Sequence, residues 1–185
     1  MEVKDALLKR RTIRKFKQTP ILENTLKELV NYARLAPFAA NVQALKYKII
    51  TEKALCDKIF DNVKWAGYLP DGAPKEGEKP VSYIAVLGDT SIKQNFETDA
   101  GTAIFSIILG AWGMGIGSCF MGAIDRKNIA KILELEEKYS LLYIIALGYP
   151  SEESKECKYI DNPKYYYDEI GTLNVPKLSL EDIII

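Results

Sequence analysis

Apolar residues recur every three or four positions in several parts of the chain, which is the spacing of one face of an α-helix. The pattern is clearest after Pro20 and stops at Pro37, because a proline disfavours the helical conformation of the residue before it. Amphipathic helices are therefore predicted, and they cover residues 3–10, 21–36, 52–63 and 126–135.

A second pattern consists of uninterrupted apolar runs. Residues 82–89 and 140–150 are short and rich in β-branched side chains, which favours buried strands over helices. Two further strands are predicted at 47–51 and 116–122. The helix expected at 95–111 is apolar on most sides, so it should be buried within the chain or against a partner subunit.

The longest uncharged stretch runs from Ala100 to Ile124 and is long enough to span a bilayer. Glycines interrupt it, however, and the letters GAWGMGIGS are typical of a helix end, a turn and the start of a strand. We therefore expect a buried helix and a buried strand instead of a membrane span. The N-terminus lacks the apolar core of a signal peptide, so we expect a cytoplasmic protein.

The order of the predicted elements bears on the fold class. Helices precede the first strand, which favours an α+β domain with a central mixed sheet flanked by helices over a doubly wound nucleotide fold. The letters GMGIGSCF lack the third glycine of a dinucleotide fingerprint and follow a helix instead of a strand. Because the chain has no internal repeat and no long linker, residues 1–185 are expected to form a single domain.

Composition excludes several kinds of chemistry. The 25 basic and 25 acidic residues give a formal net charge of zero, which argues against binding nucleic acid over a broad surface. The chain has no histidine, so histidine-based triads, metal sites and acid–base catalysis are excluded. Cys56, Cys119 and Cys157 lie far apart, and we expect free thiols in a reducing compartment.

Positive charge is nevertheless concentrated in the letters KRRTIRKFK, from Lys9 to Lys17, where six of nine residues are basic. Arg10, Arg11 and Arg14 carry planar guanidinium groups that can bind a phosphate through paired hydrogen bonds. Thr12 adds a hydroxyl donor. The stretch is therefore a candidate site for an anion.

Ile13 and Phe16 alternate with these polar residues and predict that one side of the stretch is anchored in the core. Anchored arginines lose less entropy on binding than free ones, which suits a small fixed anion. A solvated basic face without a ligand is the alternative that the pattern leaves open. A nucleic-acid patch is disfavoured, because no aromatic platform alternates with the charges.

Polar residues that could bind a flat heterocycle follow the second predicted helix, in the letters APFAANVQ. Asn41 and Gln43 carry both donors and acceptors, as a ring edge with alternating C=O and N–H groups requires. Pro37 and Phe38 can present an apolar face to such a ring. An asparagine in a loop is also a common turn former, and that reading stays open.

Several segments, in this order, resemble the nitroreductase family of flavoproteins. RRTIRKF is close to the family's RRSxRxF, and YARLAPFAANVQ is similar to its A-P-S-x-x-N-x-Q-P-W. The resemblance continues through WAGYLPDGAPKEGEKPVSYIAVLGD, DAGTAIFSIILGAWGMGIGSCFMGAI and IALGYPSE, and so covers most of the chain. Phe38 replaces the usual serine, and Ala44-Leu45 replaces Pro-Trp, so the wall of the site differs from the family pattern.

The resemblance implies an intertwined homodimer that binds FMN between its subunits, with a C-terminal extension on the partner. Arg10, Arg11, Thr12 and Arg14 would then hold the flavin phosphate and ribityl chain, and Lys177 would be a further basic ligand. The residues implied to contact the ring are Pro37, Phe38, Asn41, Gln43, Met121 and Gly122. Glycine in the last of these positions would let the backbone approach flavin N5 closely.

The implied function is that of an FMN-dependent oxidoreductase. It would pass electrons from NADH or NADPH through flavin N5 to an electron-poor small molecule, such as a nitroaromatic or a quinone. The flavin would carry the chemistry, which explains how a chain without histidine can be an enzyme. Three alternatives stay open: a flavin-storage module with little turnover, a dehalogenating or dehydrogenating member of the family, and a basic interaction protein without flavin.

Aromatic and apolar residues outside these motifs predict further contacts. Trp65 and Tyr68, beside the glycine- and proline-rich loop 67–80, are candidates for a lid over the acceptor, with simple packing of the loop as the alternative. Tyr165–Tyr167 are expected at the dimer interface. The final residues 178–185 are too apolar for a free tail, so we expect them to pack on the other subunit.

Overall fold

The computed structural model describes residues 2–69 and 72–185. The helices are Val3–Lys9 (α1), Glu23–Arg34 (α2), Lys53–Phe60 (α3), Glu97–Gly113 (α4) and Arg126–Ile132 (α5), with a 3₁₀ turn at Ala39–Asn41. The strands are Phe16–Lys17 (β1), Leu45–Ile50 (β2), Ser82–Asp89 (β3), Gly117–Met121 (β4), Tyr139–Pro150 (β5), Ser154–Lys158 (β6), Tyr166–Tyr167 (β7) and Leu173–Lys177 (β8). Every helix and strand predicted from the apolar pattern is confirmed, with ends that differ by a few residues.

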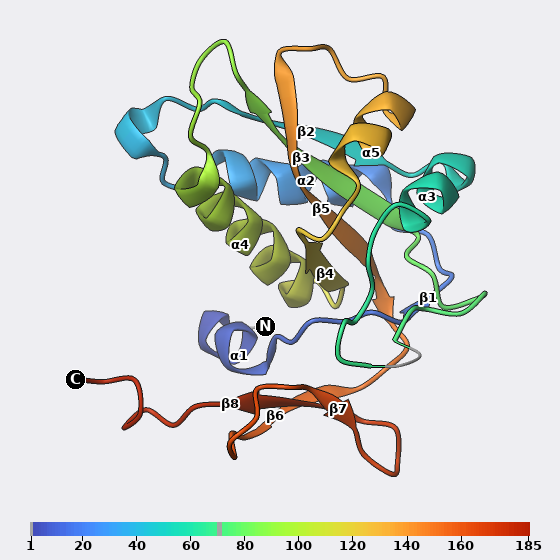
Figure 1. The fold of residues 1–185 in the computed structure, drawn as a ribbon, viewed down its shortest axis with the longest axis vertical. Helices are drawn as coiled ribbons and strands as arrows, with labels where there is room; N and C mark the ends of the chain where they lie inside the picture. The colour runs from blue at the N-terminus through green and yellow to red at the C-terminus, as the bar shows by residue number, and fades with distance from the viewer. Residues whose placement is uncertain (1, 70–71) are drawn as a thin grey trace.

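The larger sheet is built around β5, which crosses the middle of the molecule (Figure 1). β5 pairs with β1, β3 and β4, and β3 pairs with β2, all antiparallel. A smaller sheet of order β6-β8-β7 lies below it in this view, and in that sheet β6 and β8 are parallel. The mixed pairing that we expected in the central sheet is therefore found in the C-terminal one.

Helices cover both faces of the larger sheet, and the alternation of side chains along β3 shows how. Ile84 and Val86 join a cluster with apolar residues of α2 and α4. Tyr83, Ala85 and Leu87 join a second cluster with residues of α3 and α5. Because both faces are covered, every position of β3 is buried, which explains its uninterrupted apolar run.

The uncharged stretch from Ala100 to Ile124 forms most of α4, a turn and β4, as predicted. Gly115, with a φ of 75°, follows the helix end and supplies the left-handed conformation common there. Within the described residues, none of the helices combines the length and the apolar character that crossing a membrane requires. The three cysteines are free thiols, and Cys56 and Cys119 are buried.

Two glycines make room for the basic segment, which we define as residues 10–14. Gly117 of β4 faces Gly148 of β5 in register. A Cβ on Gly117 would lie 2.8 Å from Cβ of Ile13, and a Cβ on Gly148 would lie 2.8 Å from Cβ of Phe16. Both apolar side chains are fully buried, so the predicted anchoring of this stretch is confirmed.

Gly117→Ala is expected to lower the free energy of unfolding by about 1–3 kcal/mol, because the added methyl group overpacks the contact with Ile13. Urea unfolding would measure the change. Gly101→Ala is the matched control, since a Cβ there meets nothing within 4 Å and the helical site gains about 0.5–1 kcal/mol. Equal unfolding midpoints for Gly117→Ala and the wild type would show that Ile13 does not pack closely against this glycine.

Candidate functional site

The basic segment leaves α1 in an extended conformation, with φ −59° and ψ 128° at Arg10. Successive side chains of an extended chain point to opposite sides. Arg11 and Ile13 are buried, at 8% and 1% exposure, whereas Arg10, Thr12 and Arg14 are only half-buried. The segment therefore presents two guanidinium groups and a hydroxyl on one side, and it anchors itself with the other.

The guanidinium of Arg11 is bound by groups of the protein itself. Its Nη1 donates to the carbonyl oxygen of Arg10 at 2.6 Å, and its Nη2 forms an ion pair with Glu156 of β6. Arg11 thus fastens the smaller sheet to the basic segment. Of the four residues of the segment that were predicted to bind the phosphate, Arg10, Thr12 and Arg14 are the three that the structure leaves partly exposed.

The turn between β5 and β6 also contacts the segment, through Glu152. Its carboxylate accepts hydrogen bonds from the backbone N–H groups of Arg14 and Lys15 and, at 2.6 Å, from the hydroxyl of Tyr167. Burial, together with the bond to Glu152, raises the pKa of Tyr167, so the phenol stays protonated and donates. The guanidinium of Arg14 lies 4.4 Å from the centre of the Tyr165 ring.

β4 connects the basic segment to Gly122. The backbone N–H of Ile13 donates to the carbonyl oxygen of Ser118 at 3.0 Å, so the segment lies along the edge of β4 that faces away from β5. Backbone groups alternate between the two edges of a strand, so those of Phe120 and Gly122 face the same edge as Ser118. At about 3.3 Å per residue, Gly122 lies roughly 13 Å along this edge from Ser118.

A cavity of about 410 Å³ lies on one side of Gly122, lined by residues 61–64 and 122–126. Val63 forms a bridge with Ile124, and the backbone N–H of Lys64 donates to the carbonyl oxygen of Ala123 at 2.9 Å. Lys64, which is exposed, thereby lines the same cavity as Gly122. This lysine was not predicted from the sequence, because no local pattern pairs the end of α3 with the residues after β4.

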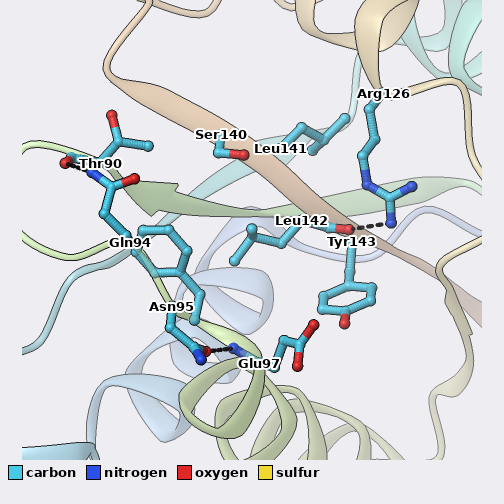
Figure 2. Close-up of a pocket in the computed structure, with 10 residues that line it drawn as sticks. Thr90, Gln94, Asn95, Glu97, Arg126, Ser140, Leu141, Leu142 and Tyr143 are labelled. Atoms are coloured by element: carbon cyan, nitrogen blue, oxygen red, sulfur yellow. Dashed lines mark hydrogen bonds between the residues drawn. The ribbon is translucent and has the colours of Figure 1, made fainter.

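A second cavity, of about 520 Å³, lies between the start of α4, the start of α5 and β5 (Figure 2). Its lining comprises Thr90, Gln94, Asn95, Phe96, Glu97, Arg126 and residues 140–143. Arg126 lines both cavities, and its Nη2 donates to the carbonyl oxygens of Gly122 at 3.1 Å and Leu142 at 3.0 Å. Figure 2 shows Arg126, Tyr143 and Glu97 along one side of this cavity.

The loop that carries Pro37, Phe38, Asn41 and Gln43 lies elsewhere. Figure 1 shows the turn near residue 40 at the far end of the sheet from β1 and from the basic segment. Asn41 and Gln43 are exposed, and Phe38 packs partly on the core. One chain by itself therefore does not bring these four ring residues together with those predicted for the phosphate, whereas Met121 and Gly122, also predicted for the ring, lie at the end of β4.

Two other predicted features are placed near the smaller sheet. Lys177 ends β8, is exposed, and lies opposite Lys158 of β6. In the loop 67–80, the centre of the Tyr68 ring lies 5.1 Å from that of Tyr165. Trp65, which precedes this loop, packs on Phe60 of α3. Positions 70 and 71 of the predicted lid lie outside the described residues, and the lid stays a prediction.

The fold and this arrangement define an α+β protein with a cationic segment along one edge of its sheet and two cavities at the far end of that edge. The model of the nitroreductase family matches residues 7–78 and 80–149, which is most of the chain. The chain therefore belongs to the nitroreductase family, and it is an oxidoreductase of that family.

Known proteins share the fold over most of its length. A curated relative, the NADH dehydrogenase of Thermus thermophilus, is 26% identical and aligns over 83% of this chain and 89% of its own. The solved FMN-dependent nitroreductase of Clostridium difficile R20291 has a TM-score of 0.69 at 26% identity, covering 84% of this chain and 91% of that one. The NADPH:FMN oxidoreductase of Vibrio harveyi, solved with NAD+, has a TM-score of 0.70 at 18% identity, covering 99% and 76%.

Proposed function

We propose that this chain is an FMN-dependent oxidoreductase that takes electrons from NADH or NADPH and passes them to an electron-poor small molecule. Relatives named for FMN, NADH and NADPH support the cofactor and the donor. The observation that carries the proposal is the shared edge of β4. The partly exposed residues Arg10, Thr12 and Arg14 lie at one end of this edge, and Gly122 lies at the other.

The residues on this edge fit FMN. Two guanidinium groups and a hydroxyl match a phosphate dianion, and the anchored segment holds them ready. Phe120, which lies between the two ends and is 46% exposed, offers apolar surface to a planar ring. Gly122 leaves its own backbone open to a close approach, because it has no side chain.

Bound FMN would supply the hydride and electron transfer, for which the side chains of this protein have no equivalent. Arg10, Thr12 and Arg14 would hold the phosphate and the ribityl chain, and the backbone at Met121 and Gly122 would orient the ring edge. The cations of Lys64 and Arg126, both near Gly122, would favour negative charge on the ring or on an acceptor oxygen. Arg11 would act indirectly, by holding the smaller sheet under the segment.

The proposal includes a homodimer in which the loop 37–43 of one chain completes the site of the other. The separation of this loop from β4 and the basic segment within one chain supports such sharing (Figure 1). The exposed apolar residues of the C-terminal tail support it as well, since Leu178, Leu180 and Ile184 are 51%, 66% and 70% exposed. Lys177, which precedes this tail, is a candidate for a further phosphate contact.

Anaerobic reduction of the FMN-loaded protein tests the proposal. NADH or NADPH is expected to bleach the flavin absorption within seconds, and a quinone or nitroaromatic is expected to restore it. Titration with each nucleotide would give the donor preference. Flavin that binds but is not bleached by either nucleotide would favour the storage module. A protein that takes up no added FMN would favour the basic interaction protein.

A further inference from the structure

Three residues of the loop 37–43 adopt an unfavourable backbone conformation. Ala40, Asn41 and Gln43 have φ values of 50°, 52° and 56°. This left-handed conformation is costly for residues other than glycine, and it persists only where the surrounding structure holds it. All three residues are exposed, so burial of their own side chains does not hold the loop. Buried Ala44, whose carbonyl oxygen accepts a hydrogen bond from the backbone N–H of Asp89 at 2.9 Å, holds the end of the loop. The start of the loop is held by the residues just before Ala40.

Asp99, in the first turn of α4, holds the start of the loop. Its Oδ1 accepts a hydrogen bond from the backbone N–H of Ala39 at 2.9 Å. One helical turn later, the hydroxyl of Thr102 lies within hydrogen-bond distance of two carbonyl oxygens, that of Pro37 at 3.1 Å and that of Asp99 at 2.9 Å. The contacts with Ala39 and Pro37 hold the backbone on both sides of Phe38, so α4 determines where the loop begins its left-handed turn.

The carboxylate of Asp99 is held as a charge inside the protein. The residue is 1% exposed, and its Oδ2 forms an ion pair with Nζ of Lys93 at 2.7 Å. Burial opposes ionisation, but the Ala39 N–H and the Lys93 ammonium outweigh it and hold the pKa of Asp99 below its usual range. A buried ion pair is a costly way to stabilise a fold, which favours a geometric role for this one.

We infer that Asp99 is a positioning residue: by fixing Ala39 it sets the loop 37–43, and through the loop it places Asn41 against the flavin ring of the partner subunit. The second half of this inference rests on the proposed function. The first half, that Asp99 controls the loop, does not depend on flavin. The two halves therefore need separate measurements.

Asp99→Asn is the test variant, because it keeps the size and one acceptor oxygen but turns an amide towards Lys93. Hydrogen exchange in a peptide covering 37–43 of FMN-free protein is expected to speed up at least tenfold. In FMN-loaded protein, the Kd for FMN is expected to rise about tenfold, and the visible absorption maximum of the flavin is expected to shift. A residue that only stabilised the fold would not move that maximum.

Two further variants control the result. Asp168→Asn makes the same change at another ion-paired aspartate, which follows β7 and accepts a hydrogen bond from the backbone N–H of Thr172. This variant should leave the loop 37–43 and the flavin spectrum unchanged. In the double variant Asp99→Asn/Lys93→Gln, the amide of Asn at position 99 faces a neutral side chain instead of the ammonium of Lys93. It is expected to bring loop exchange back to within about threefold of the wild type.

Each measurement tests one half of the inference, either the control of the loop by Asp99 or the placement of Asn41 against the flavin. Unchanged exchange in the loop of Asp99→Asn would overturn the inference, whatever the flavin does. A looser loop with an unaltered FMN Kd and spectrum would show that Asp99 fastens the loop without placing a flavin contact, and would overturn the second half. A wild type that takes up no FMN would overturn the proposed function and with it the second half, while the exchange measurement would still decide the first.

Discussion

Replacing Arg10 and Arg14 together by glutamine is expected to weaken FMN binding by about two to four orders of magnitude. Hydrogen bonds to charged groups contribute about 1.5–3 kcal/mol each, and every 1.4 kcal/mol is a factor of ten in Kd. Both residues lie on the outward side of the basic segment, half-buried and already held in place by the anchoring of Ile13. Quenching of FMN fluorescence during titration would measure the loss.

Lys9→Gln/Lys17→Gln is the matched control for this double variant. It removes the same net charge from the two ends of the same stretch, but both lysines are exposed and lie outside residues 10–14. General attraction between the basic stretch and a phosphate would lower the affinity in both double variants by a similar factor. A Kd that is unchanged in Arg10→Gln/Arg14→Gln would remove the basis of the proposed site.

The sequence predicted this segment well, because its evidence is local. Alternation of Ile13 and Phe16 with charged residues predicted an anchored stretch, and both side chains are fully buried. Local pattern did not reveal which arginine turns inward. That choice depends on Gly117, which lies about a hundred residues further along the chain and receives Ile13, and on Glu156, which pairs with Arg11.

The C-terminal strands could not be predicted for a different physical reason. β6 and β8 are short and partly exposed, and β7 has only two residues, so neither strand length nor alternation provides a signal. Their pairing depends on contacts with the basic segment, such as those of Glu152. The cavity beside Gly122 was missed for the same reason, since Lys64 and Arg126 are brought together only by the folded chain.

Removal of residues 178–185 is expected to convert the proposed dimer into a folded monomer that no longer retains FMN. β8 ends at Lys177, so the shortened chain keeps both sheets. Burying each of the apolar side chains of this tail, Leu178, Leu180 and Ile183–Ile185, would contribute about 1.5 kcal/mol or more, and both chains would lose them. The dimer dissociation constant should therefore rise by several orders of magnitude, as analytical ultracentrifugation would show.

The arginine variant and the deletion should differ in their effect on the dimer, and this difference tests whether two chains share the FMN site. Arg10→Gln/Arg14→Gln should lose FMN and remain a dimer, whereas the deletion should lose both, because the loop 37–43 departs with the partner. Glu181→Gln/Asp182→Asn is the control for the tail, since it keeps every apolar side chain and should leave the dimer intact. A shortened chain that still sediments as a dimer and keeps its flavin would contradict the role of the tail. A shortened monomer that keeps its flavin would contradict the shared site, because one chain would then suffice to hold the ring.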